Sequence, residues 1–230
     1  GNSNNFTVAS GTLTKTEDNP SNVFATWNPL SPNDSVTYSY GNGVVTGSNA
    51  TNYSMSTVGT LGASSGKYYW EMKYSTAGNG NECVGVVNLD NYEYNQNITS
   101  GTGGYVSLRW DGERQINNVS GAYFTPPSTG AVIMCAMDMD NGKVFFGSDG
   151  SWFGSGNPIT GANPTADILT SGTWSPVIRY LTSKWECNFG NGYFADNTVS
   201  SAGTNASGIG IFEYDVPTGY TALSTKGLNS

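Results

Sequence analysis

The chain has 230 residues, a length that suits one large all-β domain better than two small ones. Hydrophobic residues make up 37%, charged residues 11% and aromatic residues 13%, a balance that excludes intrinsic disorder. The formal net charge is −8, and the nine Lys and Arg are scattered along the chain. Because nucleic acids and anionic membranes require clustered basic side chains, we expect neither as a partner.

The apolar runs and cysteines bear on membrane insertion and on the redox compartment. No run approaches the ~20 apolar residues of a spanning helix, and residues 1–5 lack the pattern of a secretory leader. We therefore expect no membrane insertion. Cys83, Cys135 and Cys187 are odd in number, and each lies within an apolar stretch. This pattern predicts buried free thiols and synthesis in a reducing cytoplasm.

Strand signals dominate the first half of the chain, and no helical periodicity interrupts them. Short strands are expected at residues 23–27 and 36–40, within an N-terminal extension (residues 1–64) that packs on the main sandwich. The aromatic run 66–74, a Gly-Asn-Gly-Asn turn and the apolar run 83–87 then predict a β-hairpin.

Two further hairpins follow. Asp111-Gly112 separates the strand-like runs 105–110 and 113–116, and an Asp-Asn-Gly turn separates 132–139 from 143–146. Strands at intervals of about ten residues are typical of an antiparallel sandwich. Long polar loops, at 88–104 and 147–172, are where recognition is expected.

Six short stretches combine Gly-aromatic strands with Asn-Gly turns in a particular order. They are residues 65–71, 84–86, 137–146, 174–177, 188–190 and 217–220. Their order and spacing resemble the SPRY (B30.2-like) family. The resemblance implies an all-β, two-sheet antiparallel sandwich of the SPRY or concanavalin-like jelly-roll kind, with its core at residues 65–230. It also implies a non-enzymatic module that presents loops to a partner, including the peptide-binding role of cellular SPRY proteins.

A narrower resemblance covers Asn5-Phe6 and residues 19–30, 152–158 and 219–228, which are similar to SPRY modules of large bacteriophage virion proteins. It implies a structural or adhesion component of a virion, at the particle surface or tail, assembled in the host cytoplasm. The expected partners are other virion subunits or copies of the chain itself in a homo-oligomer. A host-surface glycan or protein is the expected recognition target.

Chemistry-bearing motifs are sparse. The chain has no histidine, which removes the Ser-His-Asp and Cys-His arrangements and the commonest metal ligand. A lectin-like glycoside hydrolase is the enzyme alternative, with Asp138 and Asp140 or Glu213 and Asp215 as carboxylate pairs at i, i+2 spacing. However, 138–142 also has the composition of a hairpin turn, and Gly142 stands where an EF-hand requires an oxygen ligand. We expect no catalytic residues, no metal site and no cofactor.

Aromatic residues in or beside polar loops, with one nearby arginine, are the candidate ligand-binding residues, because such side chains stack on sugars or anchor protein interfaces. The alternative is that they cover the open edges of the sandwich. Trp70, Trp174 and Trp185 lie in strand-like runs and are expected in the core. The arginines are expected to pair with local carboxylates. The candidate binding residues are Tyr92, Tyr94, Trp110, Arg114, Tyr123, Trp152 and Phe153.

Overall fold

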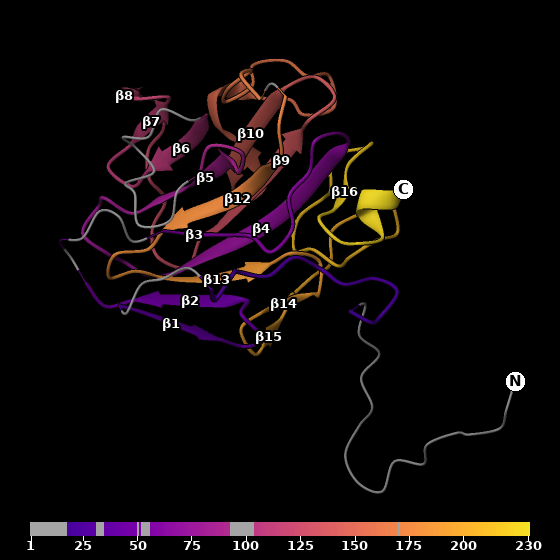
Figure 1. Cartoon of the computed structure of the whole chain (residues 1–230), viewed down its shortest axis with the longest axis horizontal. Coiled ribbons are helices and arrows are strands. Elements are labelled where there is room, and N and C mark those ends of the chain that lie inside the picture. The colour runs from indigo at the N-terminus through magenta and orange to yellow at the C-terminus, as the bar shows by residue number, and fades with distance from the viewer. Residues whose placement is uncertain (1–17, 31–34, 50, 52–55, 93–103, 170) are drawn as a thin grey trace, which may run out of the picture.

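The structure is a computed structural model that describes residues 18–30, 35–49, 51, 56–92, 104–169 and 171–230. These residues form two large β-sheets packed as a sandwich, as the sequence predicts (Figure 1). The helical elements among them are two short 3-10 turns, η1 (Phe153–Ser155) and η2 (Gly227–Asn229).

The larger sheet has eight strands, and its main path runs in the order β1-β2-β13-β4-β9-β10-β11. The pairs along this path are antiparallel, and β16 adds a short parallel pairing to β4. The strands are β1 (Val36–Ser39), β2 (Val44–Gly47), β13 (Lys184–Asn188), β4 (Lys67–Thr76), β9 (Val132–Asp138), β10 (Lys143–Ser148), β11 (Ser151–Trp152) and β16 (Thr221–Ala222).

The second sheet has six antiparallel strands in the order β3-β12-β5-β6-β7-β8. They are β3 (Ser56–Val58), β12 (Trp174–Arg179), β5 (Cys83–Asn88), β6 (Tyr105–Arg109), β7 (Glu113–Ile116) and β8 (Val119–Ala122). A separate two-stranded ribbon joins β14 (Tyr193–Phe194) to β15 (Asn197–Thr198).

The core between the sheets is rich in aromatic rings. Trp70, Trp174 and Trp185 are buried, which confirms the prediction for these three residues. The Tyr74 ring lies 4.7 Å from Trp185 and 4.7 Å from Trp110, so strands of both sheets meet through stacked rings. The three cysteines are free and buried, also as predicted. Burial raises the pKa of the Cys83 thiol to about 11, so the thiol stays protonated and unreactive.

Strand β4 is buried on both faces, and its side chains alternate between these two faces. Trp70 and Tyr74 point into the sandwich, whereas Tyr69 and Glu71 point to the outer face of the larger sheet. There the Tyr69 ring meets Phe212 at 5.0 Å. Phe212 belongs to the C-terminal segment, residues 189–230, part of which lies on this outer face, where Glu213 and Tyr214 donate their backbone N–H groups to Glu71. We call residues 189–230 the covering segment.

Two of the three predicted hairpins are confirmed, and the first is wrong. Strands β6 and β7 pair directly, as do β9 and β10. Strands β4 and β5, however, belong to different sheets, so residues 77–82 cross between the layers instead of turning within one. Glu82 makes this crossing possible: its buried carboxylate accepts hydrogen bonds from the Tyr74 hydroxyl and from the backbone N–H groups of Gly78 and Gly80.

The N-terminal region supplies strands to both sheets. Strand β2 pairs with β13 in the larger sheet, and β3 pairs with β12 in the second. The strand predicted at 23–27 is reduced to isolated bridges, Phe24 with Ser224 and Trp27 with Gly59. The strand predicted at 36–40 is present as β1.

Candidate functional site

Four of the predicted binding residues lie together at one side of the sandwich. Arg114 and Tyr123 belong to the β7–β8 side of the second sheet, and Phe153 follows β11 at the edge of the larger sheet. The Arg114 guanidinium carbon lies 4.8 Å from the Tyr123 ring centroid. The Phe153 ring lies 5.1 Å from Phe124, whose ring lies 6.0 Å from Trp110. We call these five residues the edge cluster.

The edge cluster closes the sandwich between β8 and β11. Trp110 is only 7% exposed and contacts the core rings of Tyr74 and Trp185. Tyr123, Phe124 and Phe153 are half-buried and pack against the same core. This arrangement favours the alternative interpretation of these aromatic residues, namely that they cover an open edge. Trp110 in particular has almost no surface for a ligand to contact.

The remaining predicted aromatic residues lie elsewhere. The Tyr92 hydroxyl is 2.9 Å from the Ser56 hydroxyl, and the Tyr92 ring packs on the small apolar cluster around Val58 and Val177. Tyr94 and the Asn5-Phe6 pair lie outside the described residues. Trp152 lies on the outer face of the larger sheet, where its ring meets the edge of Tyr69 at 6.5 Å.

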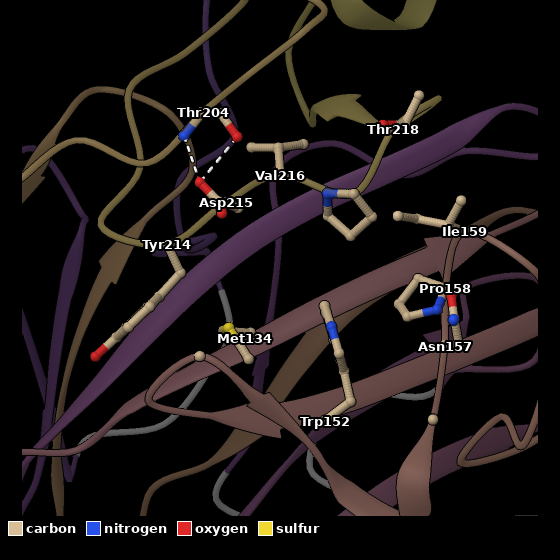
Figure 2. A pocket seen from close by; sticks show the side chains of 13 residues that line it. Met134, Trp152, Asn157, Pro158, Ile159, Thr204, Tyr214, Asp215, Val216 and Thr218 are labelled. Carbon is tan, nitrogen blue, oxygen red and sulfur yellow. Dashed lines mark hydrogen bonds between the residues drawn. The ribbon is translucent and has the colours of Figure 1, made fainter.

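Trp152 contributes to a groove of about 480 Å³ on the outer face (Figure 2). We call it the outer groove. One wall is the loop that follows β11, with Asn157, Pro158 and Ile159. The other wall belongs to the covering segment and holds Tyr214, Asp215, Val216, Pro217 and Thr218, while Met134 of β9 lies at the base. The groove is a mixed surface, apolar at its base and carrying polar groups along its rim.

Trp152 differs from the other tryptophans of the chain. Trp27, Trp70, Trp110, Trp174 and Trp185 are all buried, and only Trp152 of the six keeps part of its ring accessible. In Figure 2 its ring projects from β11 towards the wall that holds Val216. Its indole N–H makes no hydrogen bond with any residue that the structure describes.

Glu71 fixes the second wall of the groove. Its fully buried carboxylate accepts hydrogen bonds of 2.8 Å from the backbone N–H groups of both Glu213 and Tyr214, and one of 2.9 Å from the Tyr69 hydroxyl. Desolvation raises the pKa of Glu71 to about 7, although these hydrogen bonds act in the opposite direction. We did not predict a role for Glu71 from the sequence. An acidic residue inside an apolar strand is nevertheless a sequence signal for a buried carboxylate with hydrogen-bond partners.

Polar contacts fix the rim of the same wall. The Asp215 carboxylate oxygen Oδ1 accepts hydrogen bonds from the backbone N–H of Thr204 at 2.6 Å and from its hydroxyl at 2.8 Å. These hydrogen bonds lower the pKa of Asp215, which is therefore ionised at neutral pH. The Tyr214 hydroxyl lies 3.4 Å from Asp149. The Tyr220 hydroxyl is 3.4 Å from the carbonyl oxygen of Pro158 and links the covering segment to the opposite wall.

The carboxylates proposed for the hydrolase alternative have structural partners. Asp138 is 1% exposed, accepts hydrogen bonds from Asn141 and pairs with Lys67 at 2.8 Å. Asp140 accepts the backbone N–H of Gly66 at 2.7 Å. Glu213 accepts hydrogen bonds from Ser200, and Asp215 from Thr204. These four carboxylates therefore hold turns and loops of the chain together.

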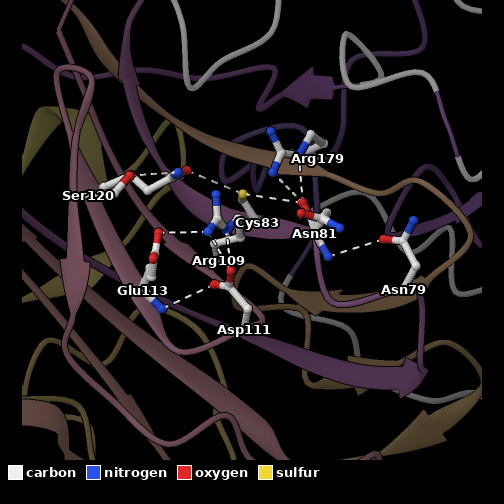
Figure 3. Close-up of polar contacts among 9 residues, drawn as sticks. Asn79, Asn81, Cys83, Arg109, Asp111, Glu113, Ser120 and Arg179 are labelled. Carbon is white, nitrogen blue, oxygen red and sulfur yellow. Dashed lines mark hydrogen bonds and ion pairs between the residues drawn. The ribbon is translucent and has the colours of Figure 1, made fainter.

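The expected pairing with local carboxylates is seen for Arg109, whereas Arg114 and Arg179 donate to backbone carbonyl oxygens 51 and 98 residues away along the chain; Arg109 and Arg179 are drawn in Figure 3. Arg109 donates to Asp111 and Glu113 at 2.7 Å each, the local pairing that the sequence predicts. Arg179 is 2% exposed and donates to the carbonyl oxygen of Asn81. Arg114 donates to the carbonyl oxygen of Thr165 at 2.8 Å. All three guanidinium groups are therefore committed to contacts within the chain.

Metal ligands and membrane-spanning helices are two further features that bear on function. Across the part of the chain that the structure describes, no group of three or more Cys, Asp or Glu is arranged to hold a metal ion. Among the same residues, no helix has the length and apolar character needed to span a membrane.

Comparison with known proteins identifies the class of fold. Residues 67–157 match the family model of the SPRY domain. The SPRY domain of human HERC1 superposes with a TM-score of 0.50 at 20% identity, covering 70% of this chain and 96% of that one. The TRIM65 PSpry domain gives 0.52 at 18% identity, covering 70% of this chain and 89% of that one. No curated protein sequence matches the chain.

A third structure shares the architecture within a larger protein. The stonustoxin structure superposes with a TM-score of 0.53 at 14% identity, covering 71% of this chain and 27% of that one. The family match at residues 67–157 and the common fold make this part of the chain SPRY-like.

Proposed function

We propose that this chain is a structural and adhesion module of a bacteriophage virion, at the particle surface or tail, assembled in the host cytoplasm. The proposal rests on the segments at 19–30, 152–158 and 219–228, which resemble phage virion modules. These segments contact one another in the structure, which supports treating them as one unit. Ala25 donates its backbone N–H to Leu223 at 2.9 Å, and Tyr220 reaches Pro158 at 3.4 Å.

The proposed partners are other virion subunits, copies of the chain itself, or a host-surface glycan or protein. Antibodies raised against the purified chain test whether the chain is located on virions. We expect immunogold labelling of the particles that the host of origin releases. Label confined to the soluble fraction of the host, with unlabelled particles, would overturn the virion proposal.

Size-exclusion chromatography with light scattering separates assembly from recognition. A stable oligomer that binds neither host cells nor isolated surface glycans supports an assembly role. A monomer that binds host cells supports recognition. A monomer that binds neither contradicts both roles and returns the chain to the wider class of SPRY binding modules.

A cellular-type peptide-binding module is the second candidate, favoured by the fold shared with the SPRY domains of HERC1 and TRIM65. Affinity selection from a random peptide library discriminates it, since enrichment of one peptide motif supports this candidate. The glycoside hydrolase alternative has no such support. For that enzyme, Asp138→Asn combined with Asp140→Asn should leave any measured polysaccharide cleavage unchanged if these carboxylates serve the turn.

A further inference from the structure

We propose that the outer groove binds a neutral oligosaccharide, with one sugar ring placed against the indole of Trp152. This inference deepens the proposed recognition role by assigning it a site and a class of ligand. It rests on the charge of the groove, on the unused hydrogen-bonding groups that line it, and on the lack of a free main-chain donor at five positions of its walls.

The charge of the groove excludes anionic ligands. No Lys or Arg is among the residues that line it, and its charged side chain is Asp215. Hydrogen bonds from Thr204 lower the pKa of Asp215, so the rim carries a negative charge at neutral pH. The whole chain has a net charge of −8. A sulfated, phosphorylated or sialylated ligand would meet repulsion without a compensating cation, whereas a neutral ligand would not.

The groove also offers hydrogen-bonding groups that the chain itself leaves unused. The Asn157 side-chain oxygen accepts the backbone N–H of Thr160 at 3.1 Å, which fixes the amide and leaves its NH₂ group available. Asp215 uses Oδ1 for Thr204, which leaves Oδ2 available. The indole N–H of Trp152 adds a donor at the base. An aromatic ring surrounded by amide, carboxylate and hydroxyl groups suits a sugar, whose faces are apolar and whose edges carry hydroxyl groups.

The walls are poor partners for an extended peptide. Pro158 and Pro217 have no backbone N–H. The N–H groups of Gly156, Asn157 and Val216 already donate to Phe153, Ala162 and Thr204, at 3.1, 2.9 and 2.8 Å. A peptide that adds a strand needs main-chain donors and acceptors along its length. At these five positions a peptide would find no main-chain donor, whereas the groove offers polar side chains there and beside them.

Both walls are held in place before any ligand arrives, which lowers the entropic cost of binding. Glu71 accepts the backbone N–H groups of Glu213 and Tyr214, and the Tyr220 hydroxyl links the covering segment to the carbonyl oxygen of Pro158. The volume of about 480 Å³ lies within the ~300–1,000 Å³ typical of small-ligand sites.

Nitrogen-15 NMR of the tryptophan indoles tests the site on the whole chain. Six indole signals are expected, and the Trp152→Phe variant assigns the signal of Trp152 by its loss. Titration uses neutral trisaccharides of glucose, galactose, mannose and N-acetylglucosamine, with sulfated and sialylated trisaccharides alongside. We expect at least one neutral trisaccharide to shift the Trp152 signal, while the five buried indoles and the anionic series show little change.

Variants then locate the contacts. Trp152→Ala should weaken binding of the responding trisaccharide about tenfold or more, because the stacking surface is lost. Asp215→Asn keeps the Oδ1 acceptor for Thr204 and replaces only Oδ2, so it should weaken binding several-fold without unfolding the chain. Tyr40→Ala is the matched control, since Tyr40 is a 55% exposed aromatic residue at the β1–β2 turn, on the opposite edge of the larger sheet.

Two outcomes overturn the inference. In one, no neutral trisaccharide shifts the Trp152 signal at millimolar concentration. In the other, the signal responds only to anionic glycans or to members of a peptide library, which would assign the groove to another class of ligand. Either result leaves immunogold labelling of particles untouched, so failure of the glycan site and failure of the virion proposal are distinguishable.

Discussion

Trp152 and Phe153 are neighbours in sequence but lie in opposite environments. Phe153 turns towards Phe124 and the edge cluster, where it helps to seal the sandwich between β8 and β11. Trp152 turns to the outer face of the larger sheet and projects into the outer groove. The edge cluster continues into the core through Trp110. The outer groove is bounded by polar contacts and keeps unused hydrogen-bonding groups.

The comparison shows what aromatic residues in polar loops can and cannot indicate. Both regions contain aromatic residues from polar loops. Trp152 ends β11 and its ring lies on the outer face, whereas Phe153 begins the following turn η1 and its ring reaches Phe124. We therefore expect the edge cluster to contribute mainly to stability and the outer groove mainly to recognition. The following predictions test this division, beginning with the largest effect.

Trp110→Ala should destabilise the chain by about 3–5 kcal/mol, the usual cost of removing a buried tryptophan from a packed core. The ring lies 4.7 Å from Tyr74 and 4.9 Å from Trp185, so the loss leaves a cavity between the two sheets. Urea unfolding followed by circular dichroism measures the change, with Tyr40→Ala as the exposed control. A loss below about 1 kcal/mol would show that Trp110 is not part of the core packing and would reopen its role in binding.

The free energy of unfolding should fall as the pH rises, because of Glu71. Its pKa is raised to about 7 in the folded chain, above the usual value of 4.5, so the folded state holds the proton more tightly than the unfolded state. The stabilisation from this proton is complete below about pH 4.5 and is lost as the pH approaches and passes 7. Its size is about 3 kcal/mol.

Unfolding free energies of the native chain and of Glu71→Gln, measured from pH 4.5 to 7.5, isolate this contribution. The amide introduced by the substitution cannot titrate, and the remaining carboxylates behave alike in both proteins. The native chain should therefore lose about 3 kcal/mol more than the variant across this range. Parallel curves would show that Glu71 does not change its protonation state there.

The fold was largely predictable from sequence because its signals are local. Hairpins joined by tight Asp-Gly and Asn-Gly turns need only the residues of the turn and its flanking strands, and both of those hairpins are present. The prediction of a hairpin from β4 to β5 was wrong. A Gly-Asn turn between two apolar runs has the same sequence pattern whether the two strands pair in one sheet or belong to different sheets. The side chain that separates these cases, Glu82, acts through contacts with Tyr74 and two glycine amides.

The candidate site was only partly predictable. The sequence indicates Trp152 as an aromatic residue in a polar loop, but the groove also needs Tyr214 and Asp215, which lie more than fifty residues further along the chain. What brings them to Trp152 is the hydrogen bonding of Glu71 to the covering segment. Long-range contacts of this kind leave no periodic signal in one sequence.

Arg114→Ala should cost about 1 kcal/mol of stability, the scale of one cation–π contact with a partly exposed hydrogen bond. The variant loses the stacking on Tyr123 at 4.8 Å and the hydrogen bond to Thr165 at 2.8 Å. Arg114→Lys serves as the control that keeps the charge but loses the planar guanidinium. If Arg114→Ala unfolds like the native chain in urea but weakens binding to host cells, the edge cluster is a recognition surface and our division is wrong.

The smallest effect is expected from Tyr214→Phe. This variant removes the contact of the Tyr214 hydroxyl with Asp149 and keeps the hydrogen bond from the Tyr214 backbone N–H to Glu71. The Tyr214 hydroxyl is 3.4 Å from Asp149 and accessible to water, so this contact is a weak hydrogen bond. Removing it should change the free energy of unfolding by no more than about 0.5 kcal/mol, because the backbone N–H of Tyr214 remains bound to Glu71. Urea unfolding beside Glu71→Gln measures both attachments on one scale. A loss above about 1 kcal/mol from Tyr214→Phe would mean that the rim contact, and not the buried carboxylate alone, holds the wall that faces Trp152.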